Sequence, residues 1–530
     1  MPMRRIVVTL CALLSLAACK ESGDRPRGVS GQSARATGGE GVLIEEGASD
    51  DLRLAPGGKH VTWLKNGEKP KRDGISPQLR IGALYAAAVD GSGARKLGEG
   101  VTNTAGGWLV SPDGRWVMFL SGYTLASRSG ALHVAALGSE EAPVRLGEGV
   151  SYMVASRDGS RIAFVEGGTL KVGPLPQGPF HAVGGEVATA DFTPDGSHVI
   201  YRRRLAAAGG LMVAATREGS EPKKLGEQVG RFKISPDGTH VAFTMRSPAT
   251  RDIYDLHVAS FPALTPRQVA AGTTEFEFSP DSRWLARLEG FEPGVKPDLV
   301  VGPSVGGEGR KLGVEVEQFT FAPKSDAIAM LVKYSDAARA GTLAYARLPD
   351  GEPKLLGARI PNFEWSGDGR TLAYIQRYLD PIYSVDLMVH ALDAEAPVKV
   401  GKGVFGYGFT PDHEQVLFRT GCIREGRSCN LMKVSARAPD GQPKLIAEGI
   451  YSYRVSDDAQ RLMVTFARTE SETYDVAVRN LDGTSHRTLH TGARLPAFLV
   501  GEDGGRAVFA VGRGKQGVYT ATTGPVQARQ

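Results

Sequence analysis

An internal repeat constrains this chain of 530 residues more than any other feature. One nine-residue pattern, typified by SPDGRWVMF at 111–119 and SPDGTHVAF at 235–243, recurs in eleven copies. The third residues of the copies stand at positions 57, 113, 158, 195, 237, 281, 324, 368, 412, 458 and 503, which gives a period close to 44 residues. A fixed period of this length indicates one supersecondary unit per copy, packed against its neighbours.

Each copy predicts four strands. Ser-Pro-Asp-Gly suits a tight turn, because Pro presets φ at the second position and Asp and Gly favour the third and fourth. Apolar residues alternate before the turn, as in Phe276-x-Phe278, and an alternating run such as Val241-Ala242-Phe243 follows it. A third strand and a fourth, which ends in a Lys/Arg-x-Leu-Gly phrase, complete the copy. The recurrent aspartates are therefore turn formers, at Asp113, Asp195, Asp237, Asp281, Asp368 and Asp412.

Four strands at a period of 40–45 residues are the signature of a β-propeller blade. Over residues 42–530 the motif resembles the TolB-type, or WD-like, propeller repeats of bacterial periplasmic proteins, and this resemblance implies an all-β fold. About 11 four-stranded blades exceed the usual four to eight of one ring. We therefore expect two packed propellers of about five and six blades, divided near residue 272, with one very large ring as the alternative. Unlike TolB, the chain has no α/β domain ahead of the repeats, so a role in the Tol–Pal system does not carry over.

The two ends of the repeat region are incomplete in complementary ways. The last copy has only a poor fourth strand in PVQARQ, whereas Val42–Gly47 reads as a fourth strand that precedes the first copy. We predict that the N-terminal strand completes the last blade and covers its edge.

Residues 1–19 read as a lipoprotein signal peptide. Arg4 and Arg5 are followed by an apolar stretch of 13 residues, too short to span a bilayer. It ends in Leu-Ala-Ala-Cys, which resembles a bacterial lipobox and implies that Cys19 is acylated; a chance Cys after an ordinary signal peptide is the alternative. Residues 20–41 predict a flexible tether. The expected location is the cell envelope, facing the periplasm, and the outer membrane is favoured over the inner because Lys20 rather than Asp follows the Cys.

Two further cysteines, Cys422 and Cys429, enclose IREGRS between two strand-like stretches. In an oxidising compartment this arrangement predicts a hairpin disulfide. No His lies in the loop and no other Cys is near, so a zinc site is not expected.

The sequence contains no convincing catalytic or cofactor motif. Gly302-Pro303-Ser304-Val305-Gly306 matches G-x-S-x-G, but a nucleophile elbow needs a following helix, and turn and strand follow here. The ten His are scattered, so neither a metal nor another cofactor is predicted. The net charge of +5 is dispersed along the chain, which argues against a nucleic-acid partner.

The remaining candidate is a binding surface. Residues four and six before the turn Asp alternate with the apolar pair, and many of them are polar, mixed in sign and different from copy to copy. We expect a mouth for a partner, with a basic and an acidic side, unless these residues only line a solvated channel. Tyr residues on neighbouring copies would serve as anchors, although core packing accounts for them as well. The candidate binding residues are Arg231, Lys233, Glu275, Glu277, Glu364, Arg454, Tyr407 and Tyr453.

The sequence thus favours a lipid-anchored, non-catalytic platform that binds an envelope protein or peptide. The alternatives are an envelope hydrolase or lyase on a propeller scaffold, and a sensor of a small molecule or glycan.

Overall fold

The computed structural model describes residues 41–524, with gaps at 48, 70–78, 204–208, 249–252, 293, 378–384, 424–425, 469–472, 502 and 512–515. Contacts divide the chain into two units, Met1–Thr37 and Gly38–Gln530, and every described residue belongs to the second. The predicted signal peptide, Cys19 and the tether up to residue 40 lie outside the described residues. The described residues form strands, turns and bends, and none of them belongs to a helix that could cross a membrane.

The strands form antiparallel sheets in which chain neighbours are sheet neighbours, as expected for propeller blades. Seven sheets of the described residues have four strands: β2–β5 (Ser49–Leu54, His60–Glu68, Ile81–Ala88, Arg95–Thr102), β13–β16 (Val187–Phe192, His198–Arg203, Leu211–Ala215, Lys223–Gly226), β17–β20 (Val229–Ile234, His240–Arg246, Tyr254–Ser260, Arg267–Ala270), β21–β24 (Glu275–Phe278, Trp284–Glu289, Asp298–Pro303, Arg310–Gly313), β25–β28 (Val316–Phe321, Ala327–Ser335, Ala340–Arg347, Lys354–Ile360), β29–β32 (Phe363–Trp365, Thr371–Arg377, Val385–Ala391, Val398–Lys402) and β33–β36 (Gly406–Phe409, Gln415–Ile423, Ser428–Ser435, Lys444–Ile450).

Two further sheets have seven strands each, because one long strand serves two successive copies. They are β6–β12 (Trp108–Val110, Trp116–Thr124, Ser129–Ala136, Val144–Ala155, Arg161–Glu166, Thr169–Pro174, His181–Gly185) and β37–β42 with β1 (Ser452–Val455, Arg461–Ala467, Tyr474–Asn480, Arg487–Val500, Arg506–Val511, Gly517–Thr522; Val42–Glu46). The first half of β9 pairs with β8 and its second half with β10. The long strand β40 pairs with β39 and β41 in the same way.

The Pro-Asp turn is built as the sequence predicts. In the copy at 193–201, Thr193 Oγ1 donates to Asp195 Oδ1 at 2.6 Å, and the backbone N–H of Ser197 donates to the same oxygen at 3.1 Å. These bonds hold the pKa of Asp195 below its ordinary value. The next residue, Gly196, has φ +67°, which explains the Gly of the motif. The aspartates are confirmed as turn formers.

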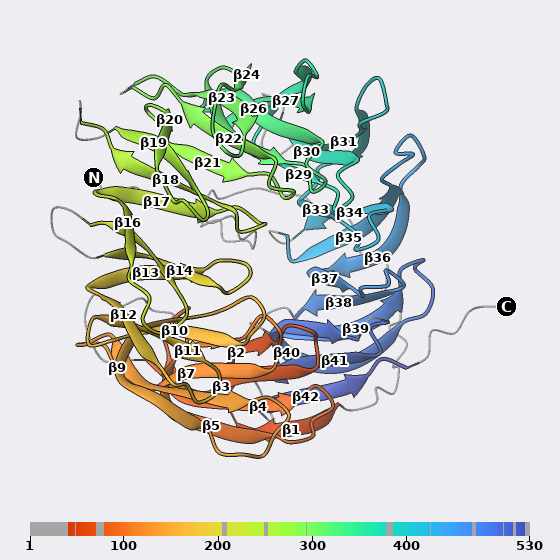
Figure 1. Ribbon diagram of the computed structural model, residues 1–530. Coiled ribbons are helices and arrows are strands. Elements are labelled where there is room, and N and C mark those ends of the chain that lie inside the picture. The colour runs from red at the N-terminus through yellow and green to blue at the C-terminus, as the bar shows by residue number, and fades with distance from the viewer. Residues whose placement is uncertain are drawn as a thin grey trace. The chain divides into compact units, whose positions relative to one another are not determined.

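Each hydrophobic core cluster of the described residues joins two successive copies, because both faces of every sheet are apolar. One cluster joins Leu256 and Val258 to Phe276, so packing is continuous across residue 272 and the expected division into two propellers finds no support. Another joins Trp63 of the first sheet to Val500 and Val508 of the last. In Figure 1 the sheets accordingly follow one another around a centre, and the red first strands lie beside the blue last ones.

The N-terminal strand completes the last copy, as predicted. Strand β1 pairs antiparallel with β42, with Val42 opposite Thr520 and Glu46 opposite Gly517. The fold is therefore an all-β propeller whose first and last copies are joined by backbone hydrogen bonds as well as by the core.

Candidate functional site

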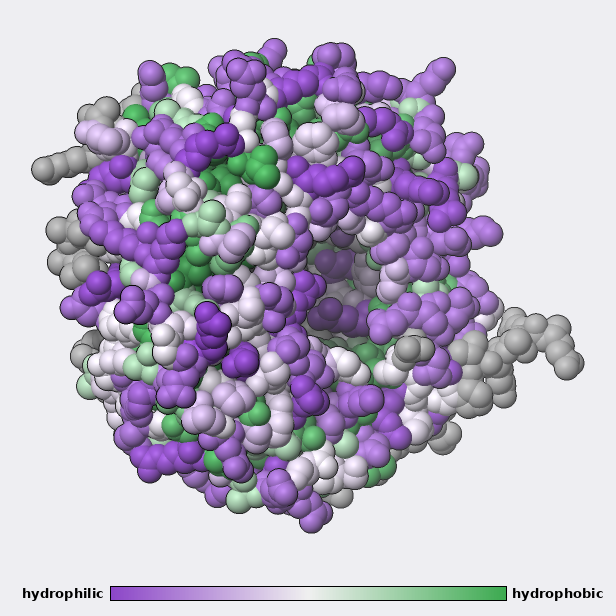
Figure 2. Space-filling model, viewed as in Figure 1, coloured by the Kyte–Doolittle hydropathy of each residue, from purple (hydrophilic) through white to green (hydrophobic). Residues whose placement is uncertain are grey.

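The innermost strand of each copy lies directly before the Pro-Asp turn and alternates between two neighbours. Residues three and five before the turn Asp pack toward the preceding copy, as Phe276 and Phe278 do against Leu256. Residues four and six face the following copy, as Arg231 does when it reaches Glu275. Figure 2 shows a hollow at the centre of the visible face, with hydrophilic residues in and around it. The charged candidates thus lie at the positions of the innermost strands that face the following copy.

Four of the candidates neutralise one another, and we call them the paired sector: Arg231, Lys233, Glu275 and Glu277. Arg231 Nη1 lies 2.5 Å from Glu275 Oε2. Two residues further along the same two strands, Lys233 donates a hydrogen bond to Glu277. Lys233 Nζ is also 3.7 Å from Glu275 Oε1. The sequence predicted a basic and an acidic side, but here the opposite charges meet in pairs, because Arg231 and Lys233 reach the carboxylates of the next inner strand.

The inner strand of the first copy contains a comparable ion pair, between Arg53 and Asp51. Arg53 Nη2 donates to Asp51 Oδ2 at 2.6 Å, and its guanidinium carbon lies 3.6 Å from the centre of the Trp108 ring of the following copy. Arg53 Nη1 also donates to Trp108 O at 3.2 Å. These charges too are satisfied within the fold.

Glu364 and Arg454 differ, because both are exposed and neither forms an ion pair among the described residues. The alignment of the copies gives the reason. Lys233 meets Glu277 at the equivalent position of the next inner strand, whereas strand pairing puts Gly408 at that position for Glu364 and Phe498 for Arg454.

The strand that lies between these two charges has no side chain at either of the positions that face the next copy. Both are glycine, Gly406 and Gly408, a combination found in no other copy. A Cβ at Gly408 would meet nothing closer than Tyr453 Oη at 3.8 Å. We call Glu364, Gly406, Gly408 and Arg454 the open sector. Sequence analysis missed the two glycines, although the alignment of the copies contained the signal.

The carboxyl group of Glu364 is held in an unfavourable place. It reaches solvent, yet the surrounding inner strands desolvate it and raise its pKa above the ordinary value. No hydrogen bond or cation offsets this cost among the described residues. Asp191 also has a raised pKa from burial, but its Oδ1 accepts the N–H of Phe192 at 2.8 Å. Among the candidates, Glu364 is thus a charge that no hydrogen bond or ion pair of the described residues stabilises.

Tyr407 and Tyr453 are partly buried and pack against the core, which is the alternative to anchors that the sequence left open. Both stand five residues before a turn Asp and pack toward the preceding copy. Tyr407 Oη donates to Ala373 O at 3.2 Å, and Tyr453 Oη to Leu417 O at 3.5 Å. Burial raises the pKa of both hydroxyls, that of Tyr453 to about 12. Their rings form part of the wall behind the open sector.

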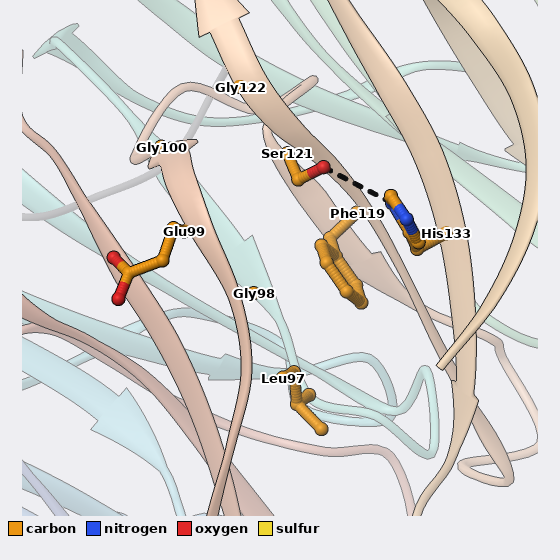
Figure 3. Close-up of a pocket in the computed structure, with 8 residues that line it drawn as sticks. All are labelled: Leu97, Gly98, Glu99, Gly100, Phe119, Ser121, Gly122 and His133. Atoms are coloured by element: carbon orange, nitrogen blue, oxygen red, sulfur yellow. Dashed lines mark hydrogen bonds between the residues drawn. The ribbon is translucent and has the colours of Figure 1, made fainter. Parts of the chain in front are cut away.

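A cavity of about 400 Å³ lies between the first two copies, lined by Leu97, Gly98, Glu99, Gly100, Phe119, Ser121, Gly122 and His133. Figure 3 shows Ser121 and His133 joined by a hydrogen bond of 3.2 Å at Nδ1. The same Nδ1 lies 3.1 Å from Ala131 O, which can only accept, so Nδ1 carries the proton and cannot take one from Ser121. His257 repeats the arrangement, with Nδ1 3.1 Å from Asp255 O and its ring stacked on Phe243. The recurrence marks this histidine as structural.

Two further expectations hold. Ser304 is 7% exposed in the turn after β23, with strand β24 rather than a helix following it. The predicted disulfide between Cys422 and Cys429 is present and closes the β34–β35 hairpin. Among the described residues no group of three His, Cys, Asp or Glu side chains is placed to hold a metal ion.

No family model and no curated protein matches the chain. Many solved structures do. A eukaryotic initiation factor is 13% identical, with a TM-score of 0.42, over 76% of this chain and 96% of that one. An oligogalacturonate lyase in complex with manganese is 10% identical, with a TM-score of 0.31, over 62% and 87%. TolB from Acinetobacter baumannii is 14% identical, with a TM-score of 0.25, over 54% and 76%. The propeller assignment is based on the sheets and cores described above.

Proposed function

We propose that this chain is a non-catalytic platform, anchored to the cell envelope by a lipid on Cys19, that binds an envelope protein or peptide through the open sector. The leader and lipobox-like residues support the location, and Cys19 itself lies outside the described residues. No nucleic acid and no cofactor is part of this proposal.

We further propose that all eleven repeat copies belong to one ring. Support comes from the core clusters, each of which joins one copy to the next, and from the cluster that joins the first copy to the last. A ring of this size has a wide centre, so its inner wall offers room for a segment of a partner.

One observation carries the choice of site. Glu364 has no hydrogen-bond or ion-pair partner among the described residues and faces a glycine position, and burial raises the pKa of its carboxyl group. Perturbed, unpaired charges of this kind gather at functional sites, because selection for binding overrides the cost in stability. Arg454 adds an opposite charge nearby, and Gly408 leaves free space between the two charges.

The test is to crosslink the full chain in its native envelope, purify it and identify crosslinked proteins by mass spectrometry. We expect one stoichiometric partner that is retained when the lipid anchor is replaced and lost in the E364Q/R454Q double variant. The matched control is the R231Q/E275Q double variant, which removes one charge of each sign from the paired sector. The absence of any stoichiometric partner, or equal loss in both double variants, would contradict the proposal.

A further inference from the structure

The rim above the open sector has a composition of its own. Phe405 directly precedes Gly406, and its side chain is 52% exposed. Ile423, at the end of β34, is 60% exposed. Both lie at the end of the β33–β36 sheet opposite its Pro-Asp turn, where β34 and β35 meet. We define the rim patch as Phe405, Ile423, Lys402 and Arg427.

The aromatic side chain of the rim patch is held by several contacts. The N–H of Phe405 donates to Arg419 O at 2.8 Å, and the guanidinium carbon of Arg419 lies 5.1 Å from the centre of the Phe405 ring. The ring also packs against the hairpin, because a Cβ added to Gly426 would come within 2.5 Å of Phe405 Cζ. The disulfide between Cys422 and Cys429 closes that hairpin. An exposed aromatic side chain that is fixed in place loses little conformational entropy when it binds a partner.

The rim patch is also basic. Lys402 and Arg427 are exposed, and neither has an ion pair among the described residues. The described residues 401–408, 419–423, 426–430 and 447–454 contain four cations (Lys402, Arg419, Arg427 and Arg454) and one carboxylate, Glu448. Asp386 lies opposite Lys402 in the ladder, but its carboxylate is paired with Lys399 at 2.5 Å. An apolar anchor beside cations that have no ion pair among the described residues is complementary to an acidic segment that carries an apolar residue.

The membrane is the other surface that such a patch could fit, and the topology argues against it. The chain enters the last sheet at its turn end, where Val42 pairs with Thr520. The hydroxyl of Thr520 donates to Val89 O, in the turn after β4, at 2.7 Å. Val42 thus lies at the turn end of the blades, whereas the rim patch lies at the hairpin end, and this favours a peptide over the membrane as the occupant of the patch.

We propose that the rim patch recognises an acidic peptide segment of the partner, with an aromatic or aliphatic residue seated against Phe405 and Ile423 and carboxylates near Lys402 and Arg427. This inference rests on the proposed function and names the chemistry of the partner. It adds the rim patch to the open sector as a second, adjoining contact.

The test is a selection of random dodecapeptides on phage against the purified full chain in detergent. The F405S/I423S/R427E variant serves for counter-selection. We expect enriched peptides to combine several Asp or Glu residues with one large apolar residue. A synthetic copy of the dominant peptide should then bind the wild type about tenfold more tightly than F405S or R427E, as measured by fluorescence anisotropy.

Two control variants separate recognition from general effects. L355S removes a leucine that is 70% exposed on β28, and K324E reverses an exposed charge in a Pro-Asp turn. Both should bind the peptide as the wild type does, and all variants should keep the wild-type circular dichroism spectrum. No enrichment, enrichment of neutral or basic peptides, or equal binding by F405S and R427E would overturn the inference. If the envelope crosslink still depends on Glu364 and Arg454 in that case, the proposed function stands without it.

Discussion

The paired sector and the open sector occupy equivalent positions of the same fold and treat charge in opposite ways. In the paired sector, Arg231 and Lys233 face Glu275 and Glu277 on the next inner strand, and every charge has a partner. In the open sector, Glu364 faces a glycine position, and its carboxyl group has a raised pKa. The propeller needs only apolar packing and turns, so it tolerates either solution. The difference indicates that charge in the open sector is kept for something other than stability.

The largest effect is expected when the open sector is converted into a paired one. Gly408→Lys places a cation at the position equivalent to Glu277, opposite Glu364. We expect this variant to lose partner capture by more than tenfold while its melting temperature stays within a few degrees of the wild type. The backbone of Gly408 is not in the left-handed region and its Cβ direction is open, so a lysine fits without strain. Crosslinking yield and thermal unfolding by circular dichroism are the measurements.

Removing single charges tests the contribution of each residue of the open sector to partner capture. We expect Glu364→Gln and Arg454→Gln each to weaken partner capture about tenfold, which corresponds to about 1.4 kcal/mol. Neither should lower the melting temperature, because neither charge has a partner in the fold among the described residues. A marked loss of stability would instead assign these residues a structural role.

A pH profile tests the cause of the difference. Burial raises the pKa of Glu364, so its carboxyl becomes neutral at a higher pH than that of an ordinary Glu. Partner capture by the wild type should therefore fall as the pH drops through this raised pKa, and the Glu364→Gln variant should not show that step. The stability of the fold changes with pH in the opposite direction. A raised carboxyl pKa in the folded state lowers stability as the pH rises from the unfolded value through the folded one. Glu364→Gln should thus gain stability relative to the wild type across that window.

The smallest effect is expected in the paired sector. Lys233→Gln leaves Glu275 and Glu277 without one of their cations, but the pairs are half exposed, so the cost should stay below about 1 kcal/mol. Partner capture should be unchanged. A larger effect on capture than that of Glu364→Gln would move the binding site back to the basic and acidic sides that the sequence first suggested.

Much of the fold could be predicted because it follows from local chemistry repeated many times. The Pro-Asp turn, the strands around it, the pairing of Val42–Glu46 with the last copy and the Cys422–Cys429 disulfide are all present. The ring arrangement could not be predicted. Every sheet has two apolar faces, whether it lies within a ring or at the boundary of one, so the residues around 272 read the same in either case.

The binding residues were only partly predictable, for a geometric reason. Alternation identified the correct positions, but it did not show that each inner strand faces the next copy. Once that direction is known, Arg231 must meet Glu275, while Glu364 meets a glycine position. Alternation also places Tyr407 and Tyr453 on the apolar face, five residues before the turn Asp. Core packing was the alternative to the anchor role, and the structure packs both rings against the core.

The most direct test of the account compares partner crosslinking in the native envelope for the wild type, Gly408→Lys and Leu355→Lys. Leu355 is 70% exposed on β28, the strand of its sheet farthest from the innermost strand, whereas Glu364 lies on the innermost strand β29 of the next sheet. The account predicts an undiminished crosslink in Leu355→Lys and a lost crosslink in Gly408→Lys, with equal expression of all three chains. An undiminished crosslink in Gly408→Lys would contradict the claim that the open sector binds the partner.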